Sequence, residues 1–219
     1  MREGLKDCEG IVYSGFDTHI AMLQKIMDDH LIRDFNNEQF NSTMLSFGRY
    51  ITGKNKITTA VKNGKKAIKS LRDYYDGHLF IDSGGFQIMT GVVKKNQIPN
   101  LIDGYCSMIN DVNEPNTYYF IEDTIPTDIN EISTINEAVD FTALGLKEMH
   151  KLPFEKRKNI YFIYHFQSPS VFDGWQKLMH QTHPNEYLES HRWSVGGIVA
   201  SKSTMFDTDF ITYMLPAID

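Results

Sequence analysis

The feature that most restricts the fold is a regular alternation of short apolar runs with longer helix-like stretches, repeating about every forty residues. The apolar runs are rich in β-branched and aromatic residues, a composition typical of strands. Strands are predicted over residues 43–47, 78–82, 117–122, 159–165 and 193–200. Helices are predicted over residues 58–74, 100–110, 130–149, 171–180 and 207–214. This alternation predicts βα units arranged around a parallel sheet.

Two details refine that prediction. The run Tyr161-Phe162-Ile163-Tyr164 shows no polar alternation, as expected of a strand covered on both faces. The predicted helix 130–149 carries an apolar stripe at helical spacing, and Asp128 or Asn130 is placed to cap its start. An open doubly wound sheet and a closed barrel both fit this pattern, because periodicity does not report the strand order.

Size and composition indicate one domain. A chain of 219 residues, 41% of them hydrophobic, can bury one sizeable core, so we expect a single domain over residues 1–219. The charged start lacks the apolar segment of a signal peptide, and no apolar run is long enough to span a membrane, so a cytoplasmic protein is expected. Cys8 and Cys106 are far apart in the sequence, which favours reduced thiols and gives no Cys-rich zinc site.

Charge is unevenly distributed. The net charge is −6, yet residues 39–72 contain no Asp or Glu. Such a block is suited to contacting nucleic-acid phosphates, while a solvated helix surface is the equally simple alternative. Its basic residues are Arg49, Lys54, Lys56, Lys62, Lys65, Lys66, Lys69 and Arg72.

Polar residues and glycines follow the predicted strands. In parallel α/β folds the active site collects at the carboxyl ends of the strands. Carboxylates, amides, paired glycines and an aromatic ring together suit a flat, hydrogen-bonding heterocycle such as a purine. Taken singly, each is more often a turn or a helix cap than a functional site. The four tips are Asp82-Ser83-Gly84-Gly85-Phe86-Gln87, Glu122-Asp123-Thr124-Ile125-Pro126, His165-Phe166-Gln167-Ser168 and Ser194-Val195-Gly196-Gly197-Ile198.

The first of these tips resembles a known signature. Asp82-Ser83-Gly84-Gly85-Phe86-Gln87, after Leu79-Phe80-Ile81, is similar to the DSGGFQ element of the tRNA-guanine transglycosylase superfamily, and the later tips agree in order. The similarity covers about residues 79–200. It implies a TIM-type (β/α) barrel and an exchange reaction in which guanine is replaced by a 7-deazaguanine such as preQ0.

The resemblance also implies residue roles. Asp82 matches the carboxylate that acts as general acid/base, and Phe86 matches the residue that stacks on the base. Asp123, or Glu122 one residue earlier, and Gln167 match the residues that read the purine edge. The remaining expected base contacts are Ser83, Gly84, Gly85, Gln87, Gly196, Gly197 and Ile198.

The sequence departs from the family in three respects. It shows about five or six βα units where a barrel has eight, so we expect a barrel incomplete at the C-terminus, truncated or completed by a partner chain. No Asp matches the position of the family nucleophile, so that residue is expected from missing sequence or from such a partner. The family zinc site is absent as well, and we expect neither a metal nor another cofactor in this chain.

Several functions remain open. The divergent N-terminal region is closer to the deazaguanine DNA transglycosylases of phages and bacterial DNA-modification clusters, so DNA is the expected substrate and phage-infected or bacterial cytoplasm the expected location. The alternatives are a tRNA-modifying enzyme, a non-catalytic nucleic-acid-binding subunit, a homo-oligomer of either, and an unrelated barrel enzyme for a small metabolite. Surface or cap histidines are favoured over a metal site at His180, His183 and His191, and His165 is either a pocket residue or a core histidine.

Overall fold

A single parallel sheet organises the chain. The computed structural model describes residues 13–14, 42–52, 56–73, 75–121, 124, 126, 128, 131–165, 169–185 and 193–196. The six strands pair in the order β1-β2-β3-β4-β5-β6, and every neighbouring pair is parallel. They are β1 (Tyr13–Ser14), β2 (Ser42–Ser46), β3 (His78–Asp82), β4 (Thr117–Phe120), β5 (Ile160–His165) and β6 (Trp193–Gly196).

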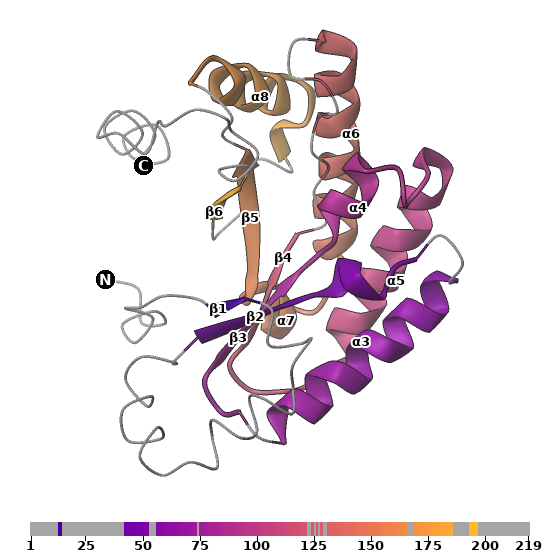
Figure 1. Cartoon of the computed structure of the whole chain (residues 1–219). Coiled ribbons are helices and arrows are strands. Elements are labelled where there is room, and N and C mark those ends of the chain that lie inside the picture. Colours follow the sequence, from indigo (N-terminus) through magenta and orange to yellow (C-terminus); the bar gives the residue numbers. More distant parts are fainter. Residues whose placement is uncertain are drawn as a thin grey trace, which may run out of the picture.

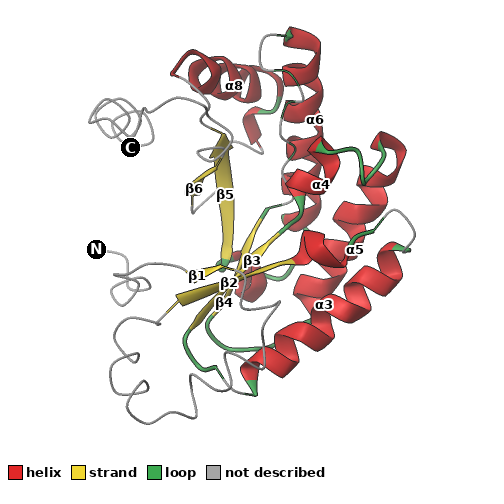
Figure 2. Cartoon of the chain, viewed as in Figure 1, coloured by secondary structure: helices red, strands yellow, loops and turns green. Residues whose placement is uncertain are grey.

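The helices form a layer along one side of this sheet (Figures 1 and 2). Neighbours in the layer follow chain order, because α3 contacts α5, α5 contacts α6, and α6 contacts α8. The long helices are α3 (Ile57–Arg72), α5 (Ile98–Asp111), α6 (Ile132–Met149) and α8 (Pro169–Thr182). Shorter ones are the 3₁₀ segments η2 (Phe47–Tyr50) and η3 (Lys95–Gln97) and the helices α4 (Gly85–Met89) and α7 (Phe154–Arg157).

The alternating α/β organisation is confirmed. β3 matches its predicted bounds, and β2, β4, β5 and β6 lie within their predicted segments or extend one residue beyond them. The strand order runs strictly in sequence, without the reversal that defines a doubly wound sheet. The predicted helix 207–214 lies outside the described residues.

Two local features differ from the sequence prediction. A short helix, α4, which was not among the predicted helices, begins directly after β3. The N-cap position of α6 is Glu131, whose side chain makes no capping hydrogen bond, and not Asp128; Asn130, the other predicted cap, lies outside the described residues. Thr134 within the first turn donates instead to the carbonyl oxygens of Asp128 and Glu131, which fixes the approach to the helix.

The main core lies between the sheet and the helices. Alternate strand residues such as Leu79, Ile81 and Tyr119 are buried against α3 and α5. Within this core the Tyr105 hydroxyl donates to the Ile81 carbonyl oxygen at 3.0 Å, which pins α5 to β3. At the other end of the layer, the Phe162 ring lies 5.4 Å from that of Trp175 on α8.

The opposite face of the sheet carries a second cluster, which we call the aromatic face: Met44, Phe80, Tyr118, Phe120 and Tyr161. Strand side chains alternate between the two faces, so these residues point away from the helices. The Phe80 ring centroid lies 5.2 Å from that of Tyr118 and 6.0 Å from that of Phe120. Phe80, Tyr118 and Tyr161 are each less than a tenth exposed.

The amino ends of the strands are tied together by Arg72. Its guanidinium donates to the carbonyl oxygens of Tyr75, Gly77 and Asn116 and to Thr117 Oγ1, at 2.6 to 3.1 Å. Burial lowers the pKa of Arg72, against the smaller opposing influence of nearby Tyr75 and Glu114. The end of α3 is thereby fixed to the starts of β3 and β4.

Within the described ranges, no helix has the length and apolarity required to cross a lipid bilayer.

Candidate active site

The best-defined polar contact at the carboxyl edge of the sheet joins Ser46 and Asp82. The two residues are register partners at the ends of β2 and β3, and Ser46 Oγ donates to Asp82 Oδ2 at 2.8 Å. Asp82 is two residues beyond Phe80 on the same strand, so its side chain projects on the aromatic face. The carboxylate is thus held in a fixed orientation, away from the helix layer.

Sequence reasoning missed Ser46. It lies at the tip of the first predicted strand, where a polar residue following Met44-Leu45 was the available signal. Its contact with Asp82 spans 36 positions and depends on the register of β2 against β3. A strand register is set by long-range pairing, so the contact itself is not encoded in any local pattern.

The turn after Asp82 is built by glycine. Gly84 has φ +110° and ψ 22°, a left-handed conformation that other residues adopt only with strain. A Cβ at Gly84 would also lie 2.9 Å from the Cα of Gly48, in η2. The paired glycines were expected to let backbone groups come close. At Gly84 the backbone that comes close is that of Gly48, in η2 after β2.

The rest of the hexapeptide divides between buried and exposed positions. Ser83 is fully buried, and Gly85 is the first residue of α4. Phe86 is 58% exposed, which leaves its ring accessible to a ligand. The side chain of Gln87 lies over Gly48, where its Oε1 is buried and accepts no hydrogen bond. Among the predicted contacts in this element, Phe86 is the one presented to solvent.

The other strand tips are described only in part. Gly196 ends β6 and is the register partner of His165, the last residue of β5. After β4, the Thr124 amide donates to Thr142 Oγ1 on α6 at 3.1 Å, which anchors that segment to the helix layer. The predicted positions Glu122, Asp123, Gln167, Gly197, Ile198 and Lys54 lie outside the described residues.

The basic block is spread along α3. Arg49 and Lys56 lie exposed near the carboxyl edge, before the helix begins. From there α3 runs for 16 residues toward the opposite edge, a length of about 24 Å. Lys62, Lys66 and Lys69 are exposed along it, whereas Lys65 pairs with Asp111 and Arg72 binds backbone carbonyls. The block therefore places only its first members near Asp82.

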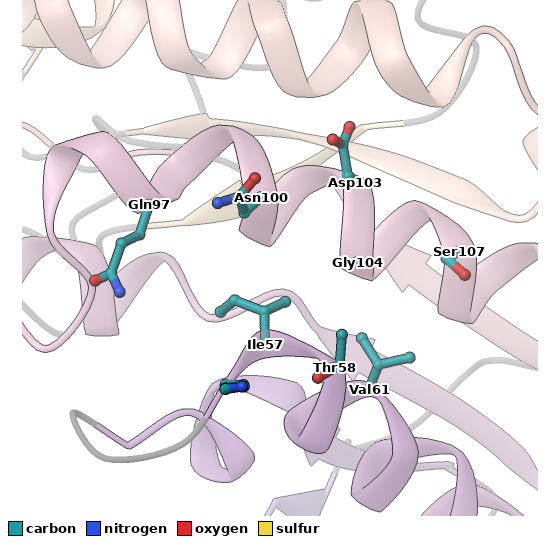
Figure 3. A pocket seen from close by; sticks show the side chains of 9 residues that line it. Ile57, Thr58, Val61, Gln97, Asn100, Asp103, Gly104 and Ser107 are labelled. Atoms are coloured by element: carbon teal, nitrogen blue, oxygen red, sulfur yellow. The ribbon is translucent and has the colours of Figure 1, made fainter.

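A hollow of about 680 Å³ lies elsewhere, between the outer surfaces of α3 and α5 (Figure 3). Its floor is apolar, with Ile57 and Val61 facing Gly104, and polar residues such as Asn100 and Ser107 line its rim. None of the predicted base-contacting residues lines it. It belongs to the helix layer, on the opposite side of the sheet from Asp82.

Three further side chains lie outside the predicted base contacts: His183, Cys106 and Tyr119. His183 Nε2 lies 2.9 Å from Asp140 Oδ1, joining the end of α8 to α6, as a surface histidine would. Cys106, on α5, is buried. Burial also raises the pKa of the Tyr119 phenol, with the nearby Arg72 charge opposing that shift.

Comparison with known proteins found no match, either among family models, among curated proteins or among solved structures.

Proposed function

We propose that this chain is a base-exchange transglycosylase that replaces guanine with a 7-deazaguanine in DNA. The observation that carries the proposal is the Asp82 carboxylate, held by Ser46 at the carboxyl edge of a parallel sheet and followed at once by the exposed Phe86. This is the arrangement that the resemblance of the hexapeptide to the transglycosylase signature implies.

The topology supports the same proposal. A sequential order of parallel strands, with the helices on one side, is the winding of a (β/α) barrel. We propose that β1 to β6 are consecutive strands of such a barrel, with the aromatic face as its interior. Asp82 then stands on the interior side at the carboxyl end, where barrel enzymes place their catalytic groups.

The chemistry assigned to Asp82 is proton transfer. When the bond between the sugar C1′ and guanine breaks, the departing base gains a proton, and the incoming 7-deazaguanine loses one when it bonds to C1′. A carboxyl group within reach of the base can donate the first proton and accept the second. Attack on C1′ needs a nucleophile as well; Asp82 is assigned here to proton transfer alone.

The neighbouring groups have matching roles. Phe86, exposed on α4, supplies a surface on which a base taken out of its helix can stack. Arg49 and Lys56, both exposed near the same edge, are the members of the basic block best placed to contact the flanking phosphates. Lys62, Lys66 and Lys69 lie farther along α3, where they would extend such contacts only to a substrate that follows the helix.

Incorporation of labelled preQ0 into duplex DNA and into tRNA tests the proposal. The full chain is assayed with and without the products of its neighbouring genes, beside Asp82→Asn. We expect label in DNA, and none with the variant, whose binding of DNA persists. Label in tRNA alone would redirect the proposal to tRNA. No label in either substrate, with the partners present, would refute an enzymatic function.

A further inference from the structure

We infer that Phe120 is a base-contacting residue, forming the floor of the site beside Asp82. The inference rests on the proposed function, because it concerns the base that Asp82 would serve. It begins from the strand register. Ile81 pairs with Tyr119, so the next residues, Asp82 and Phe120, stand level on adjacent strands. Both project on the aromatic face, because Phe80 and Tyr118, two residues earlier on the same strands, do so.

Asp82 consequently has different neighbours on its two sides. On the β2 side Ser46 occupies Oδ2 with a hydrogen bond of 2.8 Å. On the β4 side the neighbouring residue is Phe120, on a strand whose axis lies about 4.8 Å from that of β3. Ser46 holds the carboxylate from the β2 side, and the ring of Phe120 lies on the β4 side. A planar base that reaches the carboxylate from over β4 would therefore contact that ring.

The ring of Phe120 is held firmly yet remains accessible. Its centroid lies 6.0 Å from that of Phe80, with the two planes 18° apart, and 6.1 Å from that of Tyr161. Phe80 and Tyr161 are buried, at 9% and 7% exposure, whereas Phe120 is only partly buried. Phe120 is thus the outermost ring of the cluster at the level of Asp82, braced from behind by rings that do not themselves reach the surface.

These features identify the kind of ligand. A rigid aromatic surface beside a carboxylate fits a flat heterocycle with ring N–H donors, and a purine or deazapurine satisfies both contacts at once. Phe86 lies on α4, outside the sheet, whereas Phe120 is part of the sheet. The two rings would therefore contact the base from different elements.

The test measures binding of preQ0 alone to the full chain, by calorimetry, so that neither nucleic acid nor the nucleophile is needed. Phe120→Ala is expected to weaken binding about ten- to a hundredfold. Phe120→Leu, which keeps the packing volume but lacks a stacking face, should lose nearly as much. Phe120→Tyr should bind within a few-fold of the parent. Phe154→Leu, at a 62% exposed phenylalanine on α7, is the matched control and should bind unchanged.

The outcomes separate the two proposals. If the parent binds preQ0 and the folded Phe120→Leu variant, verified by its thermal unfolding, binds equally well, Phe120 is not a base contact and the inference fails while the proposed function stands. If the parent binds neither preQ0 nor guanine, the proposed function fails first. Loss of binding with Phe120→Leu and not with Phe154→Leu supports the inference.

Discussion

Replacing Gly84 with alanine tests whether the turn after Asp82 depends on backbone contact with η2. Two separate costs act at this position. The backbone has φ +110°, where a side chain adds strain of about 1–3 kcal/mol. In addition, the new Cβ would lie 2.9 Å from the Cα of Gly48, and a backbone atom moves aside only with its chain. Overpacking of this kind adds about 1–3 kcal/mol.

Gly91 provides the matched control. It too has a positive φ, of +73°, but a Cβ there would meet nothing within 4 Å. Gly91→Ala therefore carries the strain alone, about 1–2 kcal/mol, less the 0.4–1 kcal/mol or so recovered by restricting the unfolded chain. With the same recovery subtracted from both, we expect a destabilisation of about 0–1.6 kcal/mol for Gly91→Ala and about 1–5.6 kcal/mol for Gly84→Ala.

Urea unfolding of the two variants, followed by circular dichroism, measures this difference. A third variant, Gly48→Ala, approaches the same contact from the other side: its Cβ would lie 2.8 Å from the Gly84 Cα and would also displace the nearer side chain of Gln87. It should also be clearly destabilising, and the Gly48/Gly84 double variant should be non-additive. Equal free energies of unfolding for Gly84→Ala and Gly91→Ala would refute the reasoning, because the contact with Gly48 would then contribute nothing.

Three further predictions concern single side chains. Ser46→Ala removes the donor to Asp82 and should lower the rate of preQ0 incorporation about tenfold, whereas Ser46→Thr keeps the hydroxyl donor and most of the rate. Equal rates for the two variants would disprove the positioning role of Ser46. Arg72→Met should lower the free energy of unfolding by about 1–3 kcal/mol, because partly buried carbonyl oxygens lose a charged donor. Arg72→Lys should recover only part of that loss in urea titrations, since one ammonium does not reproduce the several N–H donors of a guanidinium. Burial raises the folded-state pKa of Tyr119 above its unfolded value of about 10. The neutral phenol therefore contributes fully to the free energy of unfolding below pH 10. Above pH 10 the free energy of unfolding falls by about 1.4 kcal/mol per pH unit. Unfolding free energies of the parent and Tyr119→Phe from pH 9 to 11 should diverge above pH 10, and parallel curves would contradict the assignment.

Local patterns were sufficient for most of the secondary structure. β3 was placed correctly because its apolar run is bounded by the polar His78 and Asp82. The helix α4 was missed because five residues are too few to show a helical period. The order of the described strands in the sheet was not predictable, because periodicity indicates each helix or strand but not which strands pair.

The candidate site was predictable in its residue types and less so in its contacts. The hexapeptide pointed to Asp82 and Phe86 from the sequence alone, and in the structure Phe86 is exposed while Asp82 contacts Ser46; their roles stay predictions. Ser46 was missed because only the strand register joins it to Asp82. The basic block looked uniform in sequence, but Arg72 proves to satisfy backbone carbonyls, which depends on how α3 ends against two strands.

The contact between Gly48 and Gly84 has a mechanical consequence. Backbone approaches backbone there, and the side chain of Gln87, on the helix that Gly84 caps, also lies against Gly48. Gly48 is followed directly by Arg49, and Gly84 caps the helix that carries Phe86. If Arg49 contacts a phosphate and Phe86 stacks on a base, as proposed, a displacement of the loop after β2 would also shift α4, so the two contacts would be mechanically coupled.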